Sequence, residues 1–296
     1  MPIFSKKHSI LFISKYFVDP GSVTVGKGFV FNGFEAIAYT ADTLADVLKR
    51  TRSLFKGNIR IVLSEELVYT AGLTFPIGTS LTRTSVAHAV EETIPEDLRT
   101  TEWDFQTLRY AKKQETATEI LVQAAVIESK FFRILKQAFE AVSFPVESIV
   151  SESYALAKLA AGQEGVVLLV ARNRTGGLLC AVENGFVIAT RIKRDEITPS
   201  DAETFLSFIV EHTTKKVQKI IFSYFSEENL KAFQKLSADG YELIREDYNP
   251  LIGAALNNTT GQDAEVLNLN AFLLHKRAFR FRRFFKKLLA LRLYNF

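Results

Sequence analysis

The spacing of apolar residues along the first third of the chain predicts mostly strands. Short β-branched or alternating runs are typical of strands, while one run with leucine and valine recurring every three or four residues predicts a helix. An Asn32-Gly33 pair between two β-prone runs predicts a hairpin turn. The expected strands are 9–14, 22–25, 29–31, 34–39, 59–63 and 67–70, and the expected helix is 43–54.

The same pattern continues through the rest of the chain. Pro95 and Pro145 should end the helices that precede them, and Asn184-Gly185 should turn a second hairpin. Because a hairpin, a further strand and a helix occur in this order from about residue 9 and again from about 165, we expect a two-lobed α/β protein. The expected helices are 80–92, 128–142, 153–161, 199–213, 227–236 and 250–256, and the expected strands are 101–110, 120–126, 165–170, 178–182, 186–192, 217–224 and 241–244.

Composition narrows the class of protein. The 296 residues are 47% hydrophobic and 24% charged, which is typical of a globular protein and excludes wholesale disorder. The single cysteine, Cys180, cannot form an internal disulfide and lies in an apolar run, so we expect a core residue in a reducing compartment. No stretch reaches the roughly 18 apolar residues of a membrane span, and the start is a poor signal peptide. We therefore expect a cytoplasmic protein.

The positive charge is concentrated at the end of the chain. The formal net charge is +4, yet residues 275–296 carry eight Lys and Arg and no acid, so the remainder carries −4. On a helix, these cations and the neighbouring apolar residues would form adjacent stripes, which suits the surface of an anionic membrane or a partner. The other interpretation is a solvated helix packed on the body. The proposed contact residues are Lys276, Arg277, Arg280, Arg282, Arg283, Lys286, Lys287, Phe281, Phe284, Phe285 and Leu288.

Motifs for catalysis are weak in this sequence. Residues 21–28 match the Gly-x-x-x-x-Gly-Lys core of a phosphate-binding loop, but the β-branched interior and the strand after it favour a hairpin. No metal-ligand spacing or nucleophile elbow occurs. Glu65-Glu66 and similar acidic pairs are expected to be solvated, and Trp103 is expected in the core rather than at a partner contact.

Several segments together resemble a known family. The quoted segments are Ser5-Lys6-Lys7 before Ile10-Leu11-Phe12, Val62 to Val68 with Leu73-Thr74-Phe75-Pro76, Ala89 to Pro95 followed by Trp103-Asp104-Phe105, Glu152 to Ala157, and Gly253-Ala254-Ala255-Leu256. In their order and content, they resemble the actin-like proteins of type IV pilus assembly (PilM) and the cytoplasmic part of the type II secretion protein GspL.

The resemblance implies an α/β, two-lobed actin-like (ribonuclease H-like) ATPase fold. The first lobe would cover 1–160, with a small subdomain inserted at about 79–142. The second lobe would cover 161–264, and the basic amphipathic tail would cover 265–296. Asp19, Gly21, Ser22 and Lys27 match the first phosphate loop of the family and would contact a nucleotide if one binds.

The other nucleotide motifs of the family are altered here. At the second loop, Ala171 stands where a carboxylate is expected and Asn173 where a glycine is expected. Arg194-Asp195-Glu196 replaces a glycine pair, and Ser223-Tyr224-Phe225 replaces a glycine-rich contact with adenosine. Because carboxylates hold magnesium and glycines let backbone amides approach phosphates, we expect no catalysis, no metal site and no cofactor. Binding of ATP with magnesium remains the alternative.

The resemblance also implies partners. Leu267, Asn268 and Leu269 resemble a short motif found near the inner membrane in GspL and in PilN, the partner of PilM. The expected function is a non-catalytic scaffold of a pilus or secretion platform, peripheral at the inner membrane, with a PilN-like protein, an assembly ATPase and anionic lipid as partners. A homodimer is left open. The alternatives are a nucleotide-binding, FtsA-like filament adaptor and, third, a nucleic-acid binder, which the net negative body disfavours.

Overall fold

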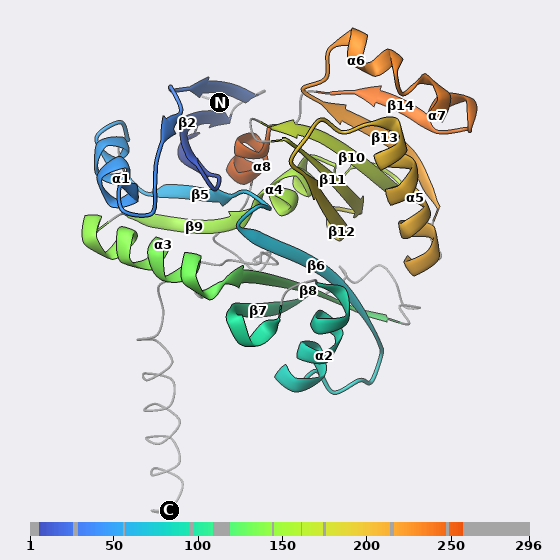
Figure 1. Cartoon of the computed structure of the whole chain (residues 1–296), viewed down its shortest axis with the longest axis horizontal. Coiled ribbons are helices and arrows are strands. Elements are labelled where there is room, and N and C mark those ends of the chain that lie inside the picture. The colour runs from blue at the N-terminus through green and yellow to red at the C-terminus, as the bar shows by residue number, and fades with distance from the viewer. Residues whose placement is uncertain are drawn as a thin grey trace, which may run out of the picture.

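The computed structural model describes residues 6–25, 29–55, 57–94, 97–108, 119–143, 145–160, 162–173, 176–213, 216–246 and 249–256. Within these residues the chain forms three β-sheets with helices packed around and between them (Figure 1). In the same ranges, we find no helix with both the length and the apolar character needed to cross a membrane.

The first lobe is built on a mixed sheet. Its strands are β1 (Lys6–Ile13), β2 (Phe17–Val25), β3 (Phe29–Gly33), β4 (Ile37–Ala38), β5 (Ile59–Leu63) and β9 (Val146–Ser151). The order is β3-β2-β1-β5-β9, with β4 also paired to β2. β1 runs antiparallel to β2 and parallel to β5, and β9 extends the parallel part. Strand β5, which lies between β1 and β9, is buried along its whole length, as expected where both faces are covered.

Helices cover both faces of this sheet. On one face, α1 (Leu44–Arg52) and α3 (Ser129–Val142) bury Leu48 and Phe139 against Leu11. On the other face, α4 (Glu152–Leu159) and α8 (Pro250–Leu256) pack against Ile10 and its neighbours. Since α4 leads directly into the second lobe and α8 follows that lobe, the two helices join the halves of the molecule.

The second lobe repeats the arrangement of the first. Its strands are β10 (Val166–Asn173), β11 (Gly176–Glu183), β12 (Phe186–Lys193), β13 (Val217–Ser223) and β14 (Glu242–Arg245). Its helices are α5 (Pro199–Thr213), α6 (Glu227–Lys231) and α7 (Gln234–Ala238). The order is β12-β11-β10-β13-β14. As in the first sheet, two antiparallel pairs are followed by two parallel pairs. The predicted hairpin turn is confirmed, because Asn184 and Gly185 both have positive φ, 51° and 78°.

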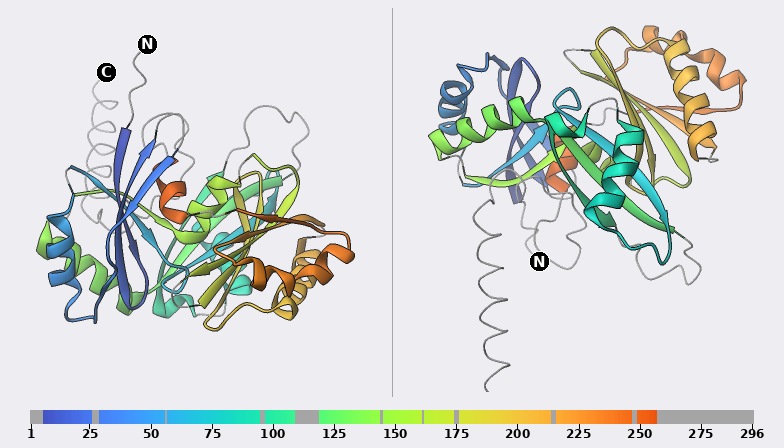
Figure 2. Two further views of the ribbon diagram at one scale, coloured as in Figure 1. Left: turned by 90° about the horizontal axis from the view of Figure 1, so that it is seen from above. Right: turned by 60° about the horizontal axis from the view of Figure 1, so that its bottom comes forward.

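A small antiparallel sheet forms the third unit. It contains β6 (Val68–Pro76), β7 (Thr101–Leu108) and β8 (Glu119–Glu128), with α2 (Arg83–Thr93) and the 3-10 turn η1 (Leu98–Thr100) beside it. Figure 2 shows α2 lying across this sheet. Trp103 is buried as predicted, with the Arg83 guanidinium 4.2 Å from its ring centre.

The small sheet is fitted closely to the second lobe. β6 lies against β12, and at Gly72 an added Cβ would overlap the carbonyl oxygens of Val187 and Ile188. A residue with a side chain would push the two backbones apart, so glycine is required at this position. Thr190 adds a polar contact by donating from Oγ1 to the carbonyl oxygen of Thr70 at 3.4 Å.

Two sequence predictions of local structure need correction, and one strand was missed. Asn32-Gly33 does not turn a hairpin, because β3 and β4 both pair with β2 and Gly33 has no positive φ. Strand β9 was not predicted, and the helix predicted at 227–236 is split into α6 and α7. The domain bounds stay a prediction, although β6 precedes the proposed insertion at 79–142 and α3 packs in the first core.

Candidate functional site

A cleft of about 520 Å³ separates the two lobes above α4 and α8. In Figure 2, α8 lies between the strands of the first lobe and those of the second. Much of the lining is aromatic or aliphatic, and the polar side chains come from both lobes. The apolar members include Phe12, Phe31, Phe34, Leu156, Tyr224 and Leu251, and the polar ones are Ser14, Asp19, Glu152, Arg172 and Asn249.

The residues predicted for the first phosphate loop lie in a strand instead of a loop. Asp19, Gly21 and Ser22 are inside β2, where they pair with Phe12, Ile10 and Ser9 of β1. This confirms the hairpin interpretation of the Gly-x-x-x-x-Gly-Lys match. Extended strand geometry aligns backbone amides with neighbouring strands, so it leaves no ring of amides to surround a phosphate.

The four residues predicted to contact a nucleotide lie in different surroundings. Asp19 lines the cleft. Gly21 faces a phenyl ring, since an added Cβ would lie 2.8 Å from Phe31 Cε2, so close packing accounts for this glycine. Ser22 is buried, and its Oγ has no hydrogen-bond partner among the described residues. Lys27 lies outside the described residues. Whether these four residues contact a nucleotide stays a prediction.

The substituted second loop reaches the same cleft. Ala171 and Arg172 line it at the end of β10, next to the first lobe. The Arg172 guanidinium is held by Glu196 at 3.1 Å, and Glu196 also accepts a hydrogen bond from the Asn229 amide at 2.9 Å. The acidic residue that replaces the expected glycine pair therefore forms an ion pair with the cation that could otherwise meet a phosphate.

Tyr224 stands where the resemblance expects a glycine-rich contact. It has a positive φ of 62°, which is unfavourable for a residue with a side chain, and its partly exposed ring lines the cleft. Phe225 turns the other way and packs in the core of the second lobe against Phe222 and Phe233. The cleft wall at this point is thus an aromatic ring rather than open backbone.

A buried polar network lies beside the cleft and was not predicted. Glu65 is 4% exposed, which contradicts the expectation that it is solvated. Its carboxylate accepts hydrogen bonds from Thr70 Oγ1 at 2.8 Å and from the Ser153 hydroxyl. Glu152 accepts from Ser64 Oγ at 3.1 Å. Burial, with a smaller contribution from the charge of Glu152, raises the pKa of Glu65 to about 8.

The described charged side chains that line the cleft are mostly acidic. Among the residues that the structure describes, its lining has two carboxylates, Asp19 and Glu152, and one cation, Arg172, which is paired. Within the same residues, no group of three or more His, Cys, Asp or Glu is placed to bind a metal ion.

Helix α8 is held under the cleft by a buried arginine. Arg60, on strand β5, donates from Nη1 to the carbonyl oxygens of Ala254 and Ala255, both at 2.8 Å. Its Nη2 donates to Glu147 Oε1 at 2.9 Å. Because the last carbonyls of a helix lack partners within the helix, Arg60 caps α8 and fixes it to the first sheet.

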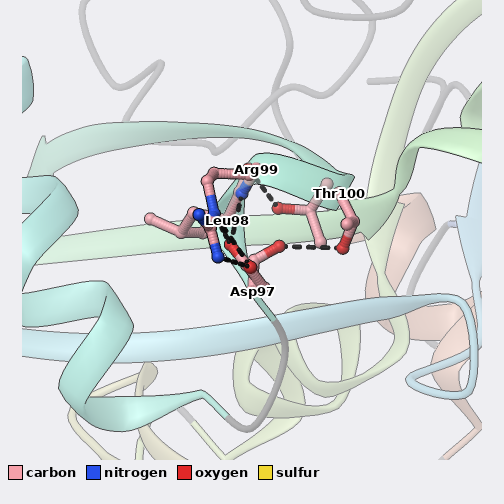
Figure 3. A network of polar contacts seen from close by, with 5 residues as sticks. Asp97, Leu98, Arg99 and Thr100 are labelled. Carbon is pink, nitrogen blue, oxygen red and sulfur yellow. Dashed lines mark hydrogen bonds and ion pairs between the residues drawn. The ribbon is translucent and has the colours of Figure 1, made fainter.

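A second cavity, of about 700 Å³, lies where the small sheet meets α3 and β12. Figure 3 shows how one of its lining residues is held: Asp97 caps η1 and accepts from the backbone and guanidinium of Arg99. These hydrogen bonds lower the pKa of Asp97 to about 2. The charged side chains around the cavity have both signs: Glu65, Glu66, Glu128, Arg99, Lys130 and Arg133.

The remaining predicted contacts lie outside the described residues. This applies to the motif Leu267, Asn268 and Leu269 and to the basic and apolar residues from Lys276 to Leu288. Their roles stay predictions.

The two matching sheets, joined by α4 and α8 around a central cleft, define an actin-like ATPase fold. Three of the solved structures that are similar to this chain illustrate it. A PilM-PilN type IV pilus biogenesis complex has a TM-score of 0.57 at 13% identity, covering 89% of this chain and 94% of that one. A protein of actin-like ATPase fold and unknown function from Bacteroides thetaiotaomicron has a TM-score of 0.56 at 9% identity, covering 84% and 95%.

The third is the cytoplasmic domain of EpsL, an inner membrane component of the type II secretion system of Vibrio cholerae. It has a TM-score of 0.54 at 10% identity, covering 86% of this chain and 99% of that one. No family model and no curated protein matches the sequence. The resemblance to the PilM and GspL proteins is therefore confirmed at the level of the fold.

Proposed function

We propose that this chain is a non-catalytic actin-like scaffold in the assembly platform of a type IV pilus or type II secretion system at the inner membrane. The observation that carries the proposal is the likeness of fold to the PilM-PilN complex and to cytoplasmic EpsL, which extends over 94% and 99% of those chains. Nearly the full length of both solved chains, rather than one shared lobe, therefore has a counterpart here.

The absence of catalysis is part of the proposal and is supported by the chemistry of the cleft. Ala171 stands where the resemblance expects a carboxylate, Arg172 is paired with Glu196, and Tyr224 forms part of the wall. Among the residues that the structure describes, the only cation lining the cleft is Arg172, which is already paired, so little positive charge is available to stabilise a transferred phosphoryl group. The fold would then serve as a rigid frame for protein contacts.

The proposed partners are a PilN-like membrane protein and an assembly ATPase. The cavity between the small sheet and α3 suits an extended peptide, because Glu66 and Glu128 can accept from its amides while Lys130 and Arg133 can donate to its carbonyls. Either a segment of the membrane protein or this chain's own Leu267-Asn268-Leu269 would occupy it.

The basic tail would hold the scaffold at the membrane. Residues 275–296 contain eight Lys and Arg and no acid. Attraction to an anionic leaflet is about 1 kcal/mol for each cation near the surface, to which buried apolar residues add. The chain would therefore be peripheral at the inner face of the membrane.

Vesicle sedimentation tests the membrane role. The full chain should bind vesicles containing phosphatidylserine, and replacement of Arg280, Arg283 and Lys287 by Glu should abolish binding. A matched control replaces three exposed cations of the body, Lys49, Arg50 and Lys231, by Glu. Equal loss in both variants, or equal binding by both, would contradict a specific role of the tail.

The alternative function is a nucleotide-binding, FtsA-like filament adaptor. It is favoured by the position of two carboxylates, since Asp19 on β2 and Glu152 on α4 line the same cleft. Binding of Mg·ATP to the intact chain distinguishes this function from the non-catalytic scaffold.

A further inference from the structure

The second lobe carries an apolar groove between α5 and α7 that neither the cleft nor the partner cavity uses. Leu206 of α5 and Leu236 of α7 form its buried floor, while Val210 is 47% exposed at its side. The cavity measures about 480 Å³. An exposed valine beside two buried leucines offers an apolar surface to a further segment.

Acidic side chains surround this groove. Glu203 and Glu211 of α5 and Asp239 after α7 all line it. Lys235 stands next to the groove and pairs with Glu203 at 3.0 Å, an ion pair that lies on the exposed rim. The acids therefore exceed the cations at the rim, and a basic segment would be attracted.

The sign of its charged lining residues distinguishes this groove from three other cavities. The cleft is lined by Arg172, and the partner cavity by Arg99, Lys130 and Arg133. A smaller cavity beside Glu66 is lined by Lys15 and Arg194. Of these four cavities, the groove between α5 and α7 has only acids among its charged lining residues. A strongly basic segment should therefore prefer it.

We propose that the groove binds this chain's own C-terminal segment, residues 275–296, when that segment is not on a membrane. The segment combines eight cations with phenylalanines and leucines, which matches an apolar floor with an acidic rim. Charge complementarity is the reason for choosing this occupant, because the segment holds all of the chain's excess positive charge.

The connecting residues are long enough. Residues 257–274 can span up to about 60 Å when extended, which is about three times the radius of gyration of ~19 Å for a compact chain of this length. At tethered concentrations in the millimolar range, a weak site is sufficient for intramolecular binding.

The consequence is a competition between two binding surfaces. Lipid and groove would compete for the same cations and the same apolar residues of the C-terminal segment. The part of this inference that concerns the membrane rests on the proposed function. A protein in solution would hold its tail on the second lobe, and contact with an anionic membrane would release the groove.

Cross-linking in the full chain tests the proposal. Cys180 is fully buried, so a short bismaleimide reagent will react with introduced cysteines. One variant carries Val210→Cys and Leu288→Cys. The control carries Glu228→Cys, an exposed residue of α6 outside the groove, and Leu288→Cys. We expect intramolecular cross-linking of the groove pair to be about tenfold faster or more, and to slow in high salt.

The outcomes are distinguishable. Equal rates for the two pairs, or products linking two molecules only, would overturn docking in the groove. Adding Glu211→Lys to the groove pair should slow its cross-linking, whereas adding Glu227→Lys should not. If phosphatidylserine vesicles slow the groove pair, the competition is supported. If vesicles have no effect while the groove pair remains faster, docking stands and the membrane role fails.

Discussion

At the scale of single residues, the buried carboxyl group of Glu65 should make stability depend on pH. Its pKa is raised from 4.5 to about 8, so the folded protein keeps a proton that the unfolded chain releases. The free energy of unfolding should therefore fall as pH rises from about 4.5 to about 8. Glu65→Gln should remove this fall, which urea denaturation at several pH values will measure. Parallel pH profiles for the two proteins would contradict a buried, protonated Glu65.

Gly253 offers a second test at this scale. An added Cβ would overlap the carbonyl oxygen of Ala155, because α4 and α8 cross closely there. Gly253→Ala should destabilise the protein by about 1–3 kcal/mol, although alanine usually favours a helix by about 0.5–1 kcal/mol. The control is Gly162→Ala, where an added Cβ meets nothing within 4 Å. If both substitutions change the melting temperature equally, α4 and α8 do not cross as closely as described.

At the residue scale, burial could be predicted from the sequence where the neighbouring residues are apolar. Cys180 and Trp103 are buried because their surroundings are apolar strands. Sequence reasoning failed for Glu65, since an acidic pair after a strand is usually solvated, and only the return of β9 and α4 covers this residue. It also assigned Asp19 and Gly21 to a loop, whereas their pairing with β1 makes them strand.

At the scale of elements, the position of α8 depends on Arg60. Arg60→Met keeps much of the side-chain length but removes three hydrogen bonds to α8 and Glu147. Because hydrogen bonds to charged groups contribute about 1.5–3 kcal/mol, we expect a loss of at least that size. Arg172→Met, which removes an exposed ion pair, should cost less than about 1 kcal/mol. Equal losses in chemical denaturation would show that Arg60 does not fix the helix.

Most elements could be predicted because their signals are local. The apolar stripe of α3, the proline at the start of α8 and the Asn184-Gly185 turn each act within a few residues. The failures depend on distant residues. Asn32-Gly33 has the composition of a hairpin turn, but β2 is long enough to pair with β3 and β4 one after the other. Strand β9 forms beside β5, far away in sequence.

At the scale of the whole molecule, the overall fold is that of an actin-like ATPase, whereas the cleft departs from the expected nucleotide motifs. The two sheets keep the same strand order, and α4 and α8 join them as a frame. The lining of the cleft includes the aromatic rings of Phe12, Phe31, Phe34 and Tyr224, and its described cation, Arg172, is paired. Repetition of the sheet pattern was visible in the sequence, while the juxtaposition of Arg172 with Glu196 was not, because it depends on how the loop at 194–198 folds back.

Titration of the intact chain with Mg·ATP, followed by thermal unfolding, tests the central claim most directly. A ligand that binds the folded state stabilises it by RT ln(1 + [L]/Kd), so a concentration of about 100 times Kd adds about 2.7 kcal/mol. The account predicts no rise in melting temperature at millimolar Mg·ATP relative to magnesium with sulfate. A saturable rise that Asp19→Asn removes would contradict it and favour the nucleotide-binding adaptor.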